Sequence, residues 1–226
     1  MKTKTAIFLF TISVVFSTAQ SPKPRPANFR LNSTAGLRMI DARAEVVTYK
    51  GRRALHFLPP EQPPKDGYST TAILNDTNFK DGTIELDVVG FPGKNADPDN
   101  RGFVGLAFRV KDKDQGEYIY LRPTNGRADD QLRRNHSVQY MSLPDFPWYR
   151  LRKENPGVYE AYCDMEAAGW THMKVVVTGT KARLYVNGAA QPCLVVNDLK
   201  RGQSEGPVAL WADGQVEAYF SNLRVY

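Results

Sequence analysis

The chain has 226 residues, 42% of them hydrophobic, and its 30 lysines and arginines outnumber its 24 acidic residues. This length corresponds to one domain, and the apolar content is sufficient for a large core. The net charge of +6 is a weak bias that favours anionic partners. No nucleic-acid recognition motif is found, so we expect no nucleic-acid partner, and we expect a monomer.

The first residues have the pattern of a secretory signal peptide. Lys2 and Lys4 precede an apolar run over 6–16, and small residues at 17–19 form a cleavage site. This run is too short to span a bilayer, and no other uncharged stretch is long enough, so we expect no membrane span. We predict a signal peptide over 1–19, a flexible proline-rich lead-in over 20–28 and a single domain over 29–226. The protein is then secreted or periplasmic.

Short stretches of alternating apolar and polar residues recur along the rest of the chain. The segments 83–88, 172–177 and 181–186 have this pattern, and turn-forming residues separate them. No segment has a sustained helical stripe, and only 129–134 suggests a turn or two of helix. Prolines between 59 and 64 mark a loop that crosses an edge or end of the sheets. About a dozen short strands predict an all-β fold of two packed sheets.

The stretch from 118 to 162 contains more hydrogen-bonding and stacking groups than a connecting loop requires. Tyr118, Tyr120 and Arg122 alternate along one predicted strand and therefore share a face. Arginine forks and aromatic faces suit sugars, especially acidic ones. The candidate binding residues are Tyr118, Tyr120, Arg122, Asn125, Arg127, Asp130, Arg133, Trp148 and Arg150. In the alternative interpretation, a long insertion fastens itself to the sheet through salt bridges.

We expect some of the other aromatic residues at this site and the rest in the core. Tyr149 and Tyr159 are expected to close over the row together with Trp148. Trp170 and Trp211 are flanked by apolar strand residues, so we expect them in the core.

Several segments resemble the concanavalin A-like lectin and glucanase superfamily, which includes laminin G-like domains. They are 79–88, 102–110, 170–175, 182–188, 206–211 and 220–225. Their order is similar to that of laminin G-like jelly rolls, with a tryptophan-led strand followed by an Asn-Gly turn. The resemblance covers about residues 65–226 and implies a concanavalin A-like, two-sheet antiparallel jelly-roll β-sandwich. It does not define an activity, because the superfamily includes lectins, glycosidases, lyases and adhesion modules.

Within this superfamily the chain is most similar to secreted bacterial domains of the 3-keto-disaccharide hydrolase type, which implies a role with glycans. The segment from Arg122 to Arg152 departs from those domains, because it is longer and richer in arginine. No catalytic residue is therefore carried over from them.

A retaining glucanase of this superfamily needs two glutamates that flank an aspartate on one strand. Glu85 and Asp87 begin like that motif, but Gly90 stands where the second acid is needed. We therefore expect Glu85 and Asp87 to be solvent-facing strand residues. Other carboxylates, including Glu160, show no diagnostic spacing.

A polysaccharide lyase needs a base and a cation that neutralises a carboxylate or enolate. His136 as base, Arg134 or Arg122 as neutraliser and Tyr140 supply these groups. If 137–140 is a strand, His136 and Tyr140 project from one face and Gln139 from the other. The simpler interpretation, which we favour, is a histidine that hydrogen-bonds within the loop.

Metal and cofactor sites are weakly indicated. Asp97 and Asp99 lie in an oxygen-rich loop that suits Ca²⁺, but it lacks an EF-hand pattern and we favour a solvated turn. The three histidines are far apart and lack the spacing of zinc ligands. No nucleophile elbow, phosphate loop or dinucleotide fingerprint is present, so we expect no cofactor. Cys163 and Cys193 either form a disulfide or remain as two buried thiols.

Together these patterns predict a secreted β-sandwich that binds or processes a polysaccharide fragment, which we expect to be acidic. Two alternatives stay open: a glycoside hydrolase or lyase with His136 as base, and a structural or adhesion domain without catalysis. A histidine and an acid that converge in a pocket favour chemistry, whereas a flat aromatic strip favours binding.

Overall fold

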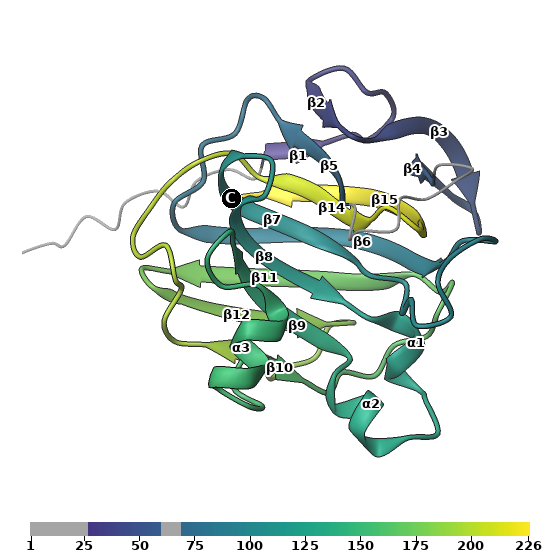
Figure 1. The fold of residues 1–226 in the computed structure, drawn as a ribbon. Helices are drawn as coiled ribbons and strands as arrows, with labels where there is room; N and C mark the ends of the chain where they lie inside the picture. The colour runs from purple at the N-terminus through teal and green to yellow at the C-terminus, as the bar shows by residue number, and fades with distance from the viewer. Residues whose placement is uncertain (1–26, 60–68) are drawn as a thin grey trace, which may run out of the picture.

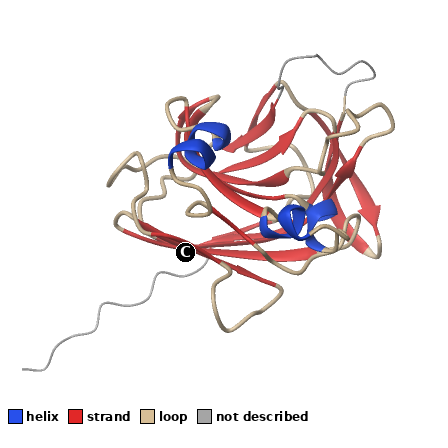
Figure 2. Cartoon of the chain, turned by 60° about the horizontal axis from the view of Figure 1, so that its bottom comes forward, coloured by secondary structure: helices blue, strands red, loops and turns tan. Residues whose placement is uncertain are grey.

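The computed structural model describes residues 27–59 and 69–226. The predicted signal peptide, most of the lead-in and three of the four clustered prolines lie outside these residues. Two antiparallel sheets pack face to face in the described part (Figures 1 and 2), which confirms the predicted all-β sandwich. No helix in the described ranges is long and apolar enough to cross a membrane.

One sheet has eight strands. They are β1 (Ala27–Phe29), β3 (Arg43–Tyr49), β4 (Arg52–Leu58), β6 (Gly82–Pro92), β11 (Thr171–Thr178), β12 (Lys181–Val186), β13 (Leu194–Val196) and β15 (Val216–Val225). Their order is β13-β12-β11-β6-β15-β4-β3, and β1 pairs with β15. The alternating segments recognised in the sequence form β6, β11 and β12 at the centre and one side of this sheet.

The other sheet has seven strands. They are β2 (Leu37–Ile40), β5 (Ser69–Leu74), β7 (Val104–Asp112), β8 (Gln115–Leu121), β9 (Val138–Leu143), β10 (Glu160–Ala161) and β14 (Ala209–Asp213). Their order is β10-β9-β8-β7-β14-β5-β2. Its central strands are almost wholly buried, so both faces of this sheet are covered.

The core lies between the two sheets. In β11 and β12, buried residues alternate with half-buried ones, as expected for strands with one face toward an apolar interior. Leu86 and Val175 come from the eight-stranded sheet, and Leu106 and Ile119 come from the seven-stranded sheet; all four are fully buried in one cluster. Burial of these side chains is the main favourable contribution to folding.

Three short helices interrupt the stretch between β8 and β10 (Figure 1). They are α1 (Pro123–Gly126), α2 (Gln131–Asn135) and α3 (Trp148–Glu154). The helical turn expected around 129–134 corresponds to α2, whereas α1 and α3 were not predicted. With 4 and 7 residues they are too short to show a helical stripe.

A disulfide joins Cys163 to Cys193. Cys163 follows β10 at the edge of one sheet, and Cys193 precedes β13 at the edge of the other. The bond therefore connects the two layers of the sandwich beside α2 and α3.

Replacing both cysteines, Cys163→Ala with Cys193→Ala, should lower the free energy of unfolding by about 3 kcal/mol, because the unfolded chain gains conformational freedom. Urea denaturation under oxidising conditions measures this loss. Wild-type protein treated with a reductant should match the double variant. An unchanged midpoint in both samples would show that the bond contributes nothing to stability.

Candidate functional site

One row of paired residues crosses the outer face of the seven-stranded sheet. Its members are Thr71, Trp211, Gly105, Tyr120, Gln139 and Glu160. Directly paired residues in antiparallel strands project from the same face, so these side chains lie side by side. Gly105 is needed at the centre, because a Cβ there would come within 2.4 Å of the Ile119 carbonyl oxygen. The rings of Tyr120 and Trp211 lie next to it with centroids 5.0 Å apart.

Two pockets open over this face, one on each side of Trp148 of α3. The first, which we call the arginine pocket, has a volume of about 550 Å³. Its polar lining includes Arg101, Arg122, Arg133, His136 and Arg152. The second, which we call the Trp211 pocket, has a volume of about 400 Å³. Its lining includes Ser69, Asp114, Tyr120, Tyr149, Trp211 and Asp213.

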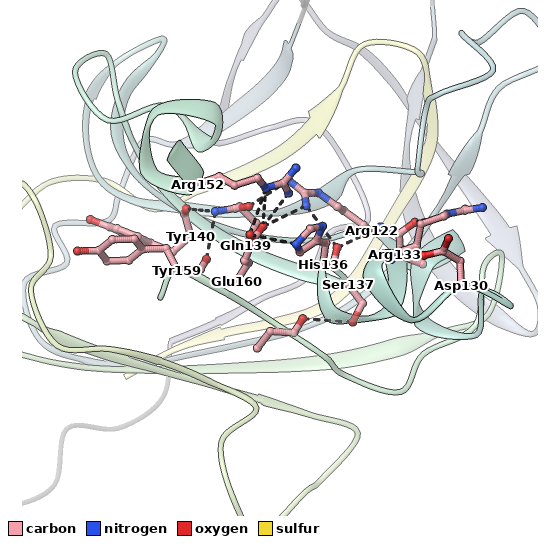
Figure 3. Close-up of polar contacts among 12 residues, drawn as sticks. Arg122, Asp130, Arg133, His136, Ser137, Gln139, Tyr140, Arg152, Tyr159 and Glu160 are labelled. Atoms are coloured by element: carbon pink, nitrogen blue, oxygen red, sulfur yellow. Dashed lines mark hydrogen bonds and ion pairs between the residues drawn. The ribbon is translucent and has the colours of Figure 1, made fainter. Parts of the chain in front are cut away.

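A buried carboxylate organises the floor of the arginine pocket (Figure 3). The Glu160 side chain is only 3% exposed, and Arg152 donates to both of its oxygens over 2.7–3.1 Å. His136 Nε2 lies 3.2 Å from Oε1, and Arg122 Nη1 lies 3.8 Å from Oε2. A buried charge is tolerated only when it is paired. Glu160 therefore holds together residues from three helical segments.

Arg122 connects this carboxylate to the sheet. Its Nη2 donates to the Tyr120 hydroxyl at 3.0 Å and to Gln139 Oε1 at 3.1 Å. The guanidinium lies 5.6 Å from the ring centre of Trp148, so the arginine also supports this aromatic side chain. Arg122 Nε is buried and has no hydrogen-bond partner within the described ranges.

His136 is held in its neutral form. Burial lowers the pKa of His136, and the charges of Arg152 and Arg122 lower it further, against the opposing effect of Glu160. His136 Nε2 lies 3.2 Å from Glu160 Oε1 as an ion-pair contact, and no described residue forms a hydrogen bond with either ring nitrogen of His136.

Six of the predicted site residues come together here. Tyr120, Arg122, Asn125, Arg133, His136 and Trp148 line one or both pockets. Tyr118 shares the outer face, as predicted, but it is 1% exposed and packs edge-on against Trp211. Tyr118 and Tyr120 share one face of β8, with Tyr118 beneath the surface, whereas Arg122 lies beyond the end of the strand and precedes α1. A binding role for the three residues stays a prediction.

Four other predicted site residues line neither pocket. Arg127 pairs with Asp164 and Glu166, and Arg150 pairs with Glu154. Asp130 caps α2 by accepting from the Arg133 amide at 2.7 Å. Arg134 donates to the Tyr162 hydroxyl at 2.9 Å.

Tyr140 was expected on the same face as His136, and this expectation is wrong. The strand begins only at Val138, and His136 ends α2, so strand alternation does not extend to it. Gln139 faces the site, whereas Tyr140 faces the interior and donates to Glu117 at 2.7 Å. Tyr159 lies with Tyr140 and donates to Asp198, so it does not close over the row.

Sequence reasoning missed Arg152, Glu160, Phe103 and Trp211 as site residues. Trp211 was expected in the core, and it is indeed only 7% exposed, but it projects from the outer face and lines a pocket. Glu160 stands in a strand of two residues, which carries no periodic signal. Only the pairing of Glu160 with Gln139 and of Trp211 with Gly105 brings them to Tyr120.

Glu85 and Asp87 lie on the other sheet, away from both pockets. Asp87 was expected to face solvent, but its side chain is 9% exposed and interacts with Arg52, His172 and Asn222.

The loop with Asp97 and Asp99 has internal partners. Asp97 Oδ1 accepts from the Asp99 amide at 2.8 Å, and the Asp99 carboxylate pairs with Arg101 at 2.8 Å. No group of three or more histidine, cysteine or acidic side chains that could hold a metal occurs in the described part of the chain.

The fold was compared with known proteins. No protein-family model and no curated protein matches the sequence. Among solved structures, the carbohydrate-binding module CBM66 from Bacillus subtilis is similar, with a TM-score of 0.57 and 17% identity over 84% of this chain and 96% of that one. A Bacillus subtilis protein with a galectin-like fold has a TM-score of 0.53 and 13% identity, over 88% and 94% of the two chains.

A third similar structure is the carbohydrate recognition domain of Emp46p, with a TM-score of 0.53 and 14% identity over 85% and 88% of the two chains. Identities this low show the fold alone. The chain has the concanavalin A-like fold that its sequence predicted. The narrower likeness to domains of the 3-keto-disaccharide hydrolase type stays a prediction.

Arg152→Met should lower the free energy of unfolding by about 1.5–3 kcal/mol, because a buried carboxylate loses its charged hydrogen bonds. Arg150→Met, in the same helix, removes an exposed pair with Glu154 and should cost less than about 0.5 kcal/mol. Chemical denaturation compares the two variants. Equal losses of unfolding free energy in the two variants would mean that Arg152 does not stabilise the buried Glu160 carboxylate.

Proposed function

We propose that the protein binds an acidic saccharide along the outer face of the seven-stranded sheet. The observation that carries this proposal is Trp148, which is 40% exposed and stands between two pockets. An exposed aromatic face stacks on a sugar ring, while nearby polar groups hydrogen-bond its hydroxyls. The guanidinium groups of Arg122 and Arg152 pack against the ring of Trp148 and support this platform, and Glu160 holds Arg152 in place.

The arginine pocket supports the acidic character of the ligand. Four arginines line it, against Asp99 in the lining and Glu160 beneath, so positive charge exceeds negative. Arg133 is only half-buried, and within the described ranges its guanidinium is engaged only through Nε, by Asn125 Oδ1 at 3.3 Å. Its two terminal nitrogens could therefore contact a carboxylate or sulfate in the pocket.

The similar structures lend support to a saccharide ligand. CBM66 is described as a carbohydrate-binding module, and the Emp46p domain as a carbohydrate recognition domain. A fold alone does not determine function, so the proposal depends on the two pockets and on Trp148. Export, proposed from the N-terminal sequence, would bring the protein to extracellular or periplasmic glycans and suits the disulfide.

Trp148→Ala should weaken binding of an acidic oligosaccharide about tenfold or more, because the stacking surface is lost. Tyr162→Ala is the matched control, since Tyr162 is also 40% exposed and lines neither pocket. Calorimetric titration with neutral, uronic and sulfated oligosaccharides measures both.

Arginine variants test the charge preference in the same titrations. Arg133→Gln should weaken acidic ligands selectively, whereas Arg127→Gln, outside both pockets, should not. A neutral oligosaccharide that binds as tightly as its uronic analogue would contradict the acidic assignment. Failure of every saccharide to bind would contradict the proposal as a whole.

The pair of His136 and Glu160 favours a second candidate function, a lyase. Neutral His136, with Glu160 3.2 Å from its Nε2, has the arrangement of a general base. Its unprotonated ring nitrogen would remove the proton next to the carboxylate of a uronic acid, while Arg122 and Arg133 stabilise the enolate. Loss of the alkoxide leaving group then forms the carbon–carbon double bond of the product.

His136→Gln should reduce such turnover at least about a hundredfold while binding persists, because the base is removed. His172→Gln, on the opposite sheet, is the control. Because the pKa of His136 lies below its usual range, the wild-type rate should stay level above about pH 6.5 and fall only at lower pH. Mass spectrometry detects the unsaturated product. If no oligosaccharide that binds is converted to this product, the lyase function is wrong and the protein is a binding module.

A further inference from the structure

We infer that the arginine pocket and the Trp211 pocket are successive subsites for one saccharide chain, which take an acidic unit and a neutral unit respectively. This inference rests on the proposed function and assigns the order of units in the ligand. It depends on the adjacency of the pockets, on their opposite charge and on the carboxylate oxygens that remain unengaged in the second pocket.

The two pockets are adjacent. Phe103 and Trp148 line both of them. Their floor is also shared, because Tyr120 of the Trp211 pocket accepts a hydrogen bond from Arg122 of the arginine pocket at 3.0 Å. Each volume falls within the range of about 300–1,000 Å³ that is usual for small-molecule sites. A chain of two sugar units therefore has room on both sides of Trp148.

The charges of the two pockets are opposite. The Trp211 pocket has Asp114 and Asp213 in its lining, and none of the described residues that line it is basic. A second carboxylate or sulfate would meet like charge there. The hydroxyls of a neutral sugar, in contrast, are donors that aspartate oxygens accept.

Each aspartate is held in place through one of its two carboxylate oxygens. Asp213 Oδ1 accepts from Asn100 Nδ2 and from the Gln215 amide, each at 2.9 Å. Asp114 Oδ1 accepts from Ser69 Oγ at 3.2 Å. No described residue donates to either Oδ2, so one oxygen of each carboxylate remains for a ligand. Contacts within the protein thus fix the position of each carboxylate and leave its Oδ2 available to accept a hydrogen bond.

The indole of Trp211 makes the second pocket observable. Its side chain lines the pocket, while Nε1 is buried and has no hydrogen-bond partner among the residues described. Trp170 differs, because its Nε1 donates to the Tyr49 carbonyl at 3.2 Å. A sugar against the Trp211 ring would therefore change the surroundings of this N–H group without accepting from it directly.

Indole N–H signals in nuclear magnetic resonance spectra test this assignment, because the chain has three tryptophans. The probes are monosaccharide uronates, neutral disaccharides, mixed acidic–neutral disaccharides and diuronic disaccharides of the gluco, galacto and manno series. A uronate should shift the signal of Trp148 alone, and a mixed disaccharide should shift Trp148 and Trp211. Trp170, on the opposite sheet, is the internal control, and Trp→Phe variants assign the signals.

Affinities distinguish this inference from the proposed function. A mixed disaccharide should bind at least about tenfold more tightly than the uronate alone or the diuronic disaccharide. If the uronate binds equally well, or the Trp211 signal stays unshifted at saturation, the two-subsite assignment is wrong while saccharide binding stands. If no saccharide binds, the proposed function is wrong and the inference fails with it.

Asp213→Asn tests the charge of the second subsite, because it keeps Oδ1 as an acceptor and removes the negative charge. The variant should bind the diuronic disaccharide at least about fivefold better relative to the mixed one. Asp164→Asn, outside both pockets, is the matched control. An unchanged ratio in Asp213→Asn would overturn the role of Asp213 in excluding a second acidic unit.

Discussion

The candidate site depends on one buried carboxylate. Glu160 is almost wholly buried, so it is stable only with cationic or donor partners, and these come from Arg152, Arg122 and His136. Arg122 precedes α1, His136 follows α2 and Arg152 lies in the last turn of α3, so each partner belongs to a different helical segment of the stretch between β8 and β10. A long insertion is thereby fastened to the edge of the sheet. The salt bridges that fasten this insertion to the sheet, as the alternative interpretation of the sequence expected, are therefore present together with the two pockets.

Regular strands form the scaffold beneath this cluster. Tyr120 and Trp211 stand on β8 and β14, the two strands that pair with β7, and Gly105 of β7 between them leaves no side chain in the way. Short helices supply the walls, while the disulfide joins the edge near Glu160 to the second sheet. Sites on regular elements keep their geometry more precisely than sites on loops alone. An aromatic platform with opposite charges on its two sides is the result.

Sequence patterns predicted the fold well and the site in part. Alternation along β6, β11 and β12 is strong because each strand has one buried face. Tyr120 was found because it alternates with Tyr118 along β8, and Arg122 was found because it continues this alternation in sequence, although it lies just beyond the end of the strand. Arg127 and Arg150 were wrongly grouped with them, because composition does not tell which arginine faces a pocket and which pairs with a nearby acid.

The sequence by itself determined the all-β class, since periodicity and turn residues are local properties, and its resemblance to a known superfamily implied the concanavalin A-like fold. It also marked the stretch that holds most of the arginine pocket. Only the tertiary structure decided that Glu160, Trp211 and His136 belong to one surface and that Tyr140 does not. Strand register and the end of α2 set these positions, and both result from contacts between residues far apart in the chain. The charge difference between the two pockets arises in the same way.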